Sequence, residues 1–246
     1  MLFQLIELLV RDPGRFFRDP GTFVLVFGFF LAVIGVSLIV AITVHEFSHA
    51  LVATLLGDNT ARRRGRLTLN PLSHLDPMGT LLIFLVGFGW GKPTPVNPHA
   101  LRTGPRAGMT QVSLAGPMSN LLTAALFALP FRMGWVSWGA PPSLALVMPL
   151  SPSMLLGNLL TFLILYNILL AVFNLIPLAP LDGFKVVLGL LPRDLALQFA
   201  RLERWGPALL LTIIAVDSLS STGILWRIIG PATNLVSQVL LQRPML

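Results

Sequence analysis

A long, mostly apolar stretch, residues 23–56, dominates the first quarter of the chain. Gly57-Asp58-Asn59 follows it and is a typical signal for the end of a helix. A helix of this length measures about 50 Å at 1.5 Å per residue, whereas the hydrocarbon core of a bilayer is about 30 Å thick. The stretch therefore predicts a transmembrane helix that tilts, kinks or projects beyond the membrane.

Three titratable side chains, His45, Glu46 and His49, lie near the carboxyl end of this stretch. Each such group costs about 2.5–3.5 kcal/mol to place in hydrocarbon, so three within five residues indicate a function. Histidines four residues apart lie on one face of a helix, and the intervening glutamate completes His-Glu-x-x-His, the zinc-hydrolase pattern. Glu46 is then the candidate general base that takes a proton from water. The pattern alone also occurs by chance in soluble helices, and its transmembrane setting is what favours a metal site.

The composition is that of a membrane protein. Hydrophobic residues make up 54% of the chain and charged residues only 11%, whereas soluble domains average about 25% charged residues. The chain has a net charge of +7. Its basic residues lie between the apolar spans and form no basic face interleaved with aromatic residues. We therefore expect a lipid bilayer as partner and no nucleic acid. Since the chain has no cysteine, a metal must bind to His, Asp or Glu.

The fold class predicted is mainly α, a polytopic membrane protein with a three-helix catalytic core. Besides the first span, apolar runs at residues 111–131 and 155–176 predict two further spans. The apolar tail, residues 207–241, is broken by polar residues and a proline and predicts one or two more. We divide the chain into three parts: an interfacial amphipathic segment at 1–22, a membrane core that carries the His-Glu-x-x-His motif at 23–190 and C-terminal membrane segments at 191–246.

Residues 80–96 begin with an apolar run of only about ten residues, too short for a spanning helix. Gly87 and Gly89 alternate in it, and Pro93 and Pro95 follow at the same period. This pattern predicts a re-entrant extended or β loop, which membrane depth permits only where the loop lines a protein cavity. A short broken helix is the alternative.

Basic residues are distributed unequally between the loops. Residues 58–110 carry seven Lys or Arg and residues 183–206 carry four, whereas residues 133–153 carry none. By the positive-inside rule the two basic segments face the cytoplasm. We therefore expect a multi-pass protein, in the cell membrane, with the histidines toward the cytoplasmic side.

Catalytic zinc usually has three protein ligands and one open position, so a third ligand must come from elsewhere. Asp182 is the best candidate, because it follows an apolar span in a proline-rich turn and approaches from the cytoplasmic side, as the histidines do. The alternatives are His74, His99, Asp76 and Asp217, of which the first three lie in polar segments where a solvated side chain is ordinary.

These motifs resemble the site-2 protease family of intramembrane zinc metalloproteases. The resemblance is carried by His45-Glu46-Phe47-Ser48-His49 and by Asn174-x-x-Pro177-x-x-x-Leu181-Asp182-Gly183. Asn70-Pro71, Gly116-Pro117-x-x-Asn120 and the glycine-rich loop also match, so that the resemblance covers roughly residues 24–190. The chain is similar to the compact subfamily without PDZ or CBS domains.

The resemblance implies a role for each matching residue. His45, His49 and Asp182 would bind one Zn²⁺ per chain, with Glu46 as the catalytic base. The residues implied on the substrate side are Asn174, Asn120, Gly87 and Gly89. Hydrogen bonding between helices is the alternative for the two asparagines, and close helix packing is the alternative for the glycines. We expect the only tyrosine, Tyr166, to pack in the core.

The function expected is hydrolysis of peptide bonds in or near transmembrane segments of other membrane proteins, as in regulated intramembrane proteolysis. One alternative is an ion transporter or channel that uses the His/Glu cluster, which predicts two related halves with broken helices, and none are evident. The other is an inactive scaffold of the same fold, which predicts loss of Glu46 or of a ligand. The sequence assigns no substrate and no oligomeric state.

Overall fold

The computed structural model describes residues 20–79, 89–138, 151–220, 223–243 and 245. Nearly all of the predicted interfacial segment 1–22, and Gly87 of the predicted loop, lie outside these ranges. In the described part the chain is mainly helical and contains no β-strand.

Four helices are long and apolar enough to cross a membrane. They are α3 (Pro20–Leu55), α6 (Pro105–Arg132), α8 (Pro152–Asn174) and α12 (Ile224–Leu241). These helices confirm the predicted class, a mainly α, multi-pass membrane protein. At 36 residues, or about 54 Å at 1.5 Å per residue, α3 is longer than a bilayer core is thick, as its sequence predicts. It ends where glycine was expected to end it, because Gly57 adopts a φ of +108° that residues with a Cβ rarely adopt.

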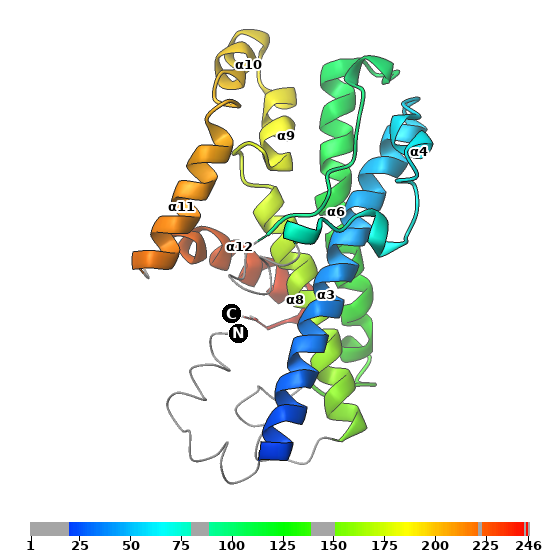
Figure 1. Cartoon of the computed structure of the whole chain (residues 1–246), viewed down its shortest axis with the longest axis vertical. Helices are drawn as coiled ribbons and strands as arrows, with labels where there is room; N and C mark the ends of the chain where they lie inside the picture. The colour runs from blue at the N-terminus through cyan, green and yellow to red at the C-terminus, as the bar shows by residue number, and fades with distance from the viewer. Residues whose placement is uncertain (1–19, 80–88, 139–150, 221–222, 244, 246) are drawn as a thin grey trace.

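The helices α3, α6 and α8 form the predicted three-helix bundle (Figure 1). Toward the amino end of α3, Phe30 and its neighbours pack on Phe162 of α8. A second cluster joins Ala124 and Ala128 of α6 to Ile164 and Ile168 of α8. Tyr166 stacks on Phe162 and packs against the first cluster. Small residues on α6 allow the bundle helices to approach closely, as is usual between transmembrane helices.

The chain after α8 forms two short helices and two longer ones. They are α9 (Asp182–Leu190), α10 (Arg193–Ala200), α11 (Gly206–Ser220) and α12. Of the two longer helices only α12 has the length of a span. In Figure 1 it runs across the α3–α8 bundle rather than along it. Its carboxyl end packs on α6 and α8 through Leu241.

Short helices α4 (Thr60–Arg63), η1 (Pro71–Ser73) and η2 (Pro98–Ala100) connect α3 to α6. Between η1 and η2, residues 91–97 form a non-helical segment that we call the strap. At its start, Gly91 forms an isolated antiparallel bridge with Leu75. The described part of the predicted loop is thus non-helical and includes a β-type pairing.

Buried charged side chains hold the strap at both ends. The guanidinium of Arg66, a residue only 7% exposed, donates to the carbonyls of Ser73, Lys92 and Pro93. At the other end, the carboxylate of Asp58 accepts the backbone N–H of Asn97 at 2.6 Å. Both contacts satisfy backbone groups that would otherwise be buried without partners.

Candidate metal centre

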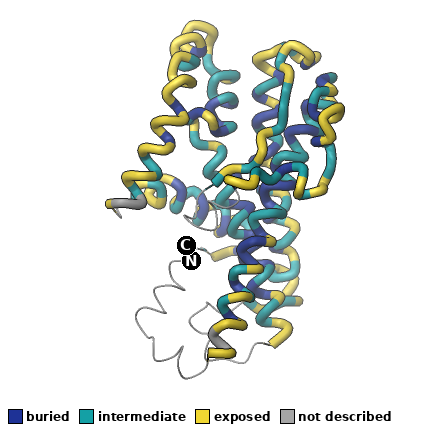
Figure 2. The backbone as a smooth tube through the Cα atoms, in the orientation of Figure 1, coloured by how far each residue is buried: buried dark blue, intermediate teal, exposed yellow. Residues whose placement is uncertain are grey.

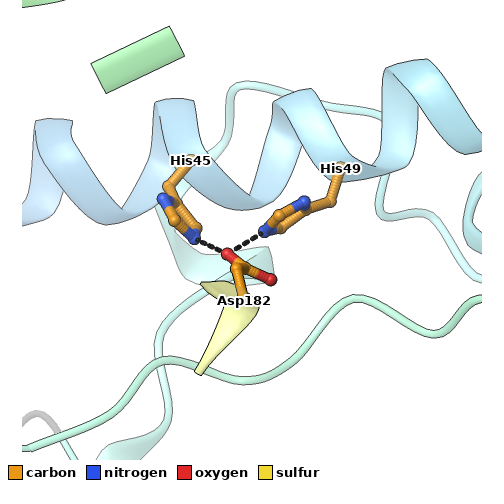
Figure 3. A group of neighbouring side chains, drawn as sticks. All are labelled: His45, His49 and Asp182. Atoms are coloured by element: carbon orange, nitrogen blue, oxygen red, sulfur yellow. Dashed lines mark hydrogen bonds and ion pairs between the residues drawn. The ribbon is translucent and has the colours of Figure 1, made fainter. Parts of the chain in front are cut away.

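Three side chains from two helices converge at one point (Figure 3). His45 and His49 lie one turn apart on α3, and Asp182 is the first residue of α9. The Oδ2 atom of Asp182 lies 3.0 Å from Nε2 of His45 and 3.1 Å from Nε2 of His49. Both histidines are buried and Asp182 is half-buried. Figure 2 shows buried backbone where the helices of the bundle face one another. The structure thus brings together the two histidines and the aspartate that the sequence singled out.

The other nitrogen of each imidazole is held by a hydrogen bond. Nδ1 of His49 lies 2.7 Å from the carbonyl oxygen of Val112, which can only accept, so Nδ1 carries the hydrogen. Nδ1 of His45 lies 2.7 Å from Oδ1 of Asn120 and likewise donates. In a neutral imidazole the remaining nitrogen, Nε2, then presents a lone pair. Both lone pairs are available where the side chains meet Asp182.

This arrangement fits a metal ion. Two imidazole nitrogens and a carboxylate oxygen, all acceptors, lie within 4.8 Å of one another, and acceptors this close require positive charge between them. Tetrahedral zinc with bonds of about 2.0–2.1 Å holds its ligand atoms roughly 3.3 Å apart, close to the 3.0 and 3.1 Å that separate Oδ2 of Asp182 from the two histidine nitrogens. Two His and one carboxylate form a set of catalytic-zinc ligands. Within the described ranges this is the group of side chains placed to hold a metal.

Gly116 of α6 keeps the space beside the ligand atoms free. A Cβ added at this position would lie 2.6 Å from Nε2 of His49 and 2.7 Å from Nε2 of His45. No real Cβ tolerates such contacts, so a residue with a side chain would displace the imidazoles. The sequence offered Gly116-Pro117 only as part of a family pattern and did not indicate this steric role.

Asp182 is aimed at the histidines by the way α9 packs. Gly183 lies against the end of α8, where a Cβ would stand 2.2 Å from the carbonyl oxygen of Leu175. At the other end of α9, Arg106 donates to the carbonyls of Leu188 and Leu191, which are free at a helix end. The Asp-Gly pair, read from sequence as a turn, thus begins a short helix that is fixed at both ends.

Glu46 contacts the strap through Thr94. Its Oε2 accepts the backbone N–H of Thr94 at 2.8 Å, and the Thr94 hydroxyl donates to the Glu46 carbonyl at 3.1 Å. Because Pro93 and Pro95 have no N–H, the amide of Thr94 is the only backbone donor in this tripeptide. The sequence identified Glu46 as the candidate base but not its contact with the strap, for which the alternating prolines were the available signal.

The residues implied on the substrate side lie in different settings. Asn174 is the last residue of α8 and half-buried, and its Nδ2 donates to the Leu170 carbonyl at 2.9 Å. Asn120 is fully buried, and its amide bonds to His45, to Asn167 and to the carbonyl of Ala41. Gly89 is half-buried, two residues before the strap.

The alternative third ligands do not join the group. His74 is fully buried in the connection after α4, where its Nε2 lies 2.7 Å from the Thr68 carbonyl. Among the described side chains that could bind a metal, neither His74 nor His99, Asp76 or Asp217 belongs to the His45–His49–Asp182 group.

Comparison with known proteins places this chemistry in a family. A Bacillus subtilis (strain 168) protein named "Putative zinc metalloprotease YwhC" is 39% identical over 191 residues, which are 78% of this chain and 83% of that protein. This chain belongs to the site-2 protease family. "Putative zinc metalloprotease Rip2" of Mycolicibacterium smegmatis (strain ATCC 700084 / mc(2)155) is 29% identical over 193 residues, 74% of this chain and 66% of Rip2. Its namesake from Mycobacterium tuberculosis (strain ATCC 25618 / H37Rv) is 32% identical over 155 residues, 61% of this chain and 53% of that protein.

No family model and no solved structure matches the chain. The site-2 protease relatives and the His45–His49–Asp182 group together support a zinc metalloprotease function. The four apolar helices are consistent with a protein that crosses the membrane several times. The zinc cofactor and the fold class predicted from sequence are therefore confirmed.

Proposed function

We propose that this site-2 protease is an intramembrane zinc metalloprotease that hydrolyses peptide bonds in or near transmembrane segments of membrane-protein substrates. The observation that carries the proposal is that His45 and His49, on a helix of membrane-spanning length, converge with Asp182. A soluble metalloprotease would have no reason to build its ligands into such a helix, given the cost of placing them in hydrocarbon.

The three converging side chains would hold zinc, and Glu46 would act as general base. Bound zinc supplies Lewis acidity and makes a water molecule acidic enough to lose its proton near neutral pH. Glu46 would take a proton from the attacking water and deliver it to the leaving amine. The Thr94 N–H that Oε2 of Glu46 accepts holds this carboxylate in place.

The substrate must present an unwound backbone. A transmembrane helix hides its carbonyls in internal hydrogen bonds, and the groups freed by unwinding need partners. We assign this task to the loop containing Gly87 and Gly89, by strand addition, and to the amide of Asn174. For Asn120 the contacts favour holding His45 over binding substrate, because both of its amide groups already bond to the protein.

The charge distribution supports a defined orientation. The basic segments of residues 58–110 and 183–206 would lie in the cytoplasm and the uncharged segment 133–153 outside. The site would then lie toward the cytoplasmic side of the cell membrane, with the bilayer as its surroundings. The core would comprise residues 23–190, flanked by an interfacial segment at 1–22 and by membrane segments at 191–246.

The decisive comparison is between the wild type and Glu46→Gln, purified in detergent and incubated with a panel of model transmembrane substrates. Both should bind one zinc per chain, and Glu46→Gln should cut about 10²- to 10⁴-fold more slowly, the usual contribution of a general base. Equal cleavage by the two proteins would contradict the role of Glu46. A zinc-loaded wild type that cuts no member of the panel would contradict the protease proposal itself.

A further inference from the structure

Asn120, whose amide contacts His45, is hydrogen-bonded to a second buried amide, that of Asn167. Asn120 of α6 and Asn167 of α8 are both fully buried, and Nδ2 of Asn120 donates to Oδ1 of Asn167 at 2.8 Å. Amide groups in the interior of a transmembrane bundle are costly unless their donors and acceptors are bonded. Asn167 belongs to none of the motifs that identified the site, so its burial beside Asn120 calls for a separate explanation.

Backbone carbonyls determine the direction of every bond in this pair. Nδ2 of Asn167 donates to the carbonyl of Leu163 at 2.8 Å, and a carbonyl can only accept. Asn167 must therefore turn its own oxygen toward Asn120. The second N–H of Asn120 donates to the carbonyl of Ala41 at 2.9 Å. With both amide hydrogens engaged, Asn120 can offer only its oxygen to His45.

The orientation of the Asn120 amide determines which nitrogen of His45 carries the hydrogen. Because His45 faces an acceptor, its hydrogen stays on Nδ1 and the lone pair stays on Nε2, which faces Asp182. A hydrogen-bond acceptor behind a ligating histidine fixes the ring orientation and makes the histidine a stronger ligand. An amide free to rotate by half a turn would instead present N–H groups to Nδ1 and would favour the tautomer that cannot bind metal through Nε2.

We infer that Asn167 is a positioning residue for the metal site: by holding the amide of Asn120 in one orientation, it keeps Nε2 of His45 available to zinc. The inference rests on the proposed zinc site, but it does not require that the protein cut any substrate. Asn167 acts only through Asn120 and does not touch the ligands.

The same helix supplies a matched control. Asn158 of α8 is 3% exposed, and in the described part of the chain its Nδ2 has no hydrogen-bond partner. It lies nine residues before Asn167, or about 14 Å along the helix, outside the chain of amides that ends at His45. Replacing either asparagine by leucine changes a buried amide in α8 to the same apolar side chain, but only Asn167 is hydrogen-bonded to Asn120 and, through it, to His45.

The experiment measures metal binding by the full chain in detergent, with Zn²⁺ and Co²⁺ titrated into the metal-free protein. Asn167→Leu should lower zinc affinity about tenfold, at the lower end of the effect of groups that hold ligating histidines. It should also change the visible absorption of bound Co²⁺, which reports ligand geometry. Asn158→Leu should leave affinity and spectrum at wild-type values.

A double-variant cycle separates positioning from a general loss of packing. If Asn167 acts through Asn120, the pair Asn120→Leu and Asn167→Leu should bind zinc no more weakly than Asn120→Leu alone, whereas independent packing effects would add. If Asn167→Leu does not fold, Asn167→Ser replaces it, since a serine hydroxyl bonds within its own helix and is too short to reach Asn120.

Any of the following results would overturn the inference: wild-type affinity and spectrum in Asn167→Leu, an equal loss in Asn158→Leu, or additive losses in the double variant. A wild-type chain that binds neither metal would overturn it as well. A wild type that binds zinc but cuts no substrate would contradict only the proposed protease function, because the zinc titrations decide the role of Asn167 on their own.

Discussion

Gly116 contributes no side chain to the metal site, yet the site requires glycine at this position, because a Cβ would contact both imidazoles. The site is crowded because the two imidazoles that meet Asp182 lie against the backbone of α6. The two histidines could be identified from their spacing, since His-Glu-x-x-His is a local pattern on one helix. The requirement for glycine could not, since it arises only where α6 passes behind the imidazoles.

Gly116→Ala should weaken zinc binding. The added methyl would contact Nε2 of both histidines, and overpacking of a tight site costs about 1–3 kcal/mol, or roughly 5- to 150-fold in affinity. Zinc content after dialysis against a graded series of chelator concentrations measures this loss. Gly230→Ala on α12 is the control, because nothing lies within 4 Å of its added Cβ. Alanine favours helices more than glycine does, so the substitution should not weaken α6 itself. Unchanged zinc binding in Gly116→Ala would show that the site relaxes to admit the methyl group.

At the scale of elements, the strap links the candidate base to the end of α3. Its position depends on Asp58, which follows α3 and is fully buried. Burial by itself would raise the pKa of Asp58, but hydrogen bonds from the Thr60 hydroxyl and from the backbone N–H groups of Asn97 and Thr60 outweigh it. They hold the pKa below its ordinary value of 3.8.

This lowered pKa predicts an acid limit for the strap. The folded state binds the Asp58 proton more weakly than the unfolded state, so the carboxylate stabilises the fold above about pH 4 and this contribution is lost as the pH falls through the lower, folded value. Asp58→Asn should lower stability by about 1–3 kcal/mol at pH 7, the cost of disrupting a buried hydrogen-bonded group. The difference between wild type and variant should shrink toward pH 3.

Thermal unfolding in detergent between pH 3 and pH 7 tests this prediction. The control is Asp194→Asn, which removes an exposed carboxylate on α10. A wild-type-to-Asp58→Asn difference that stays constant over the whole range would show that ionisation of Asp58 does not stabilise the strap. A loss of the same size in Asp194→Asn would point to net charge rather than to the strap.

For the whole molecule, the two ends of the bundle differ in charge. In Figure 1, α4 and the beginning of α6 lie at one end of the bundle, and the end of α6 lies at the other. Seven basic residues in the segment 58–110 and none in residues 133–153 predict that these ends face the cytoplasm and the outside, respectively.

Because the chain has no cysteine, single cysteines can test this orientation without background. Arg64→Cys and Ser137→Cys both replace exposed residues, one at each end of the bundle. On intact cells a membrane-impermeant maleimide should label Ser137→Cys alone, and Arg64→Cys should react only after lysis. The reverse pattern would invert the proposed topology and place the metal site toward the outer face.

The membrane class, the three core spans, the helix stop at Gly57 and the two histidines of the metal group could be predicted from the amino-acid sequence. These are properties of local composition and of helical period, and the cost of a charged group in hydrocarbon made His45, Glu46 and His49 conspicuous. Which partners those groups have depends on the tertiary structure. Asp182 meets His45 across 137 positions, Asn120 meets it across 75, and Thr94 meets Glu46 across 48. A buried polar group must find a partner, but its own sequence neighbourhood does not say which, because that depends on how the helices and the strap pack around it.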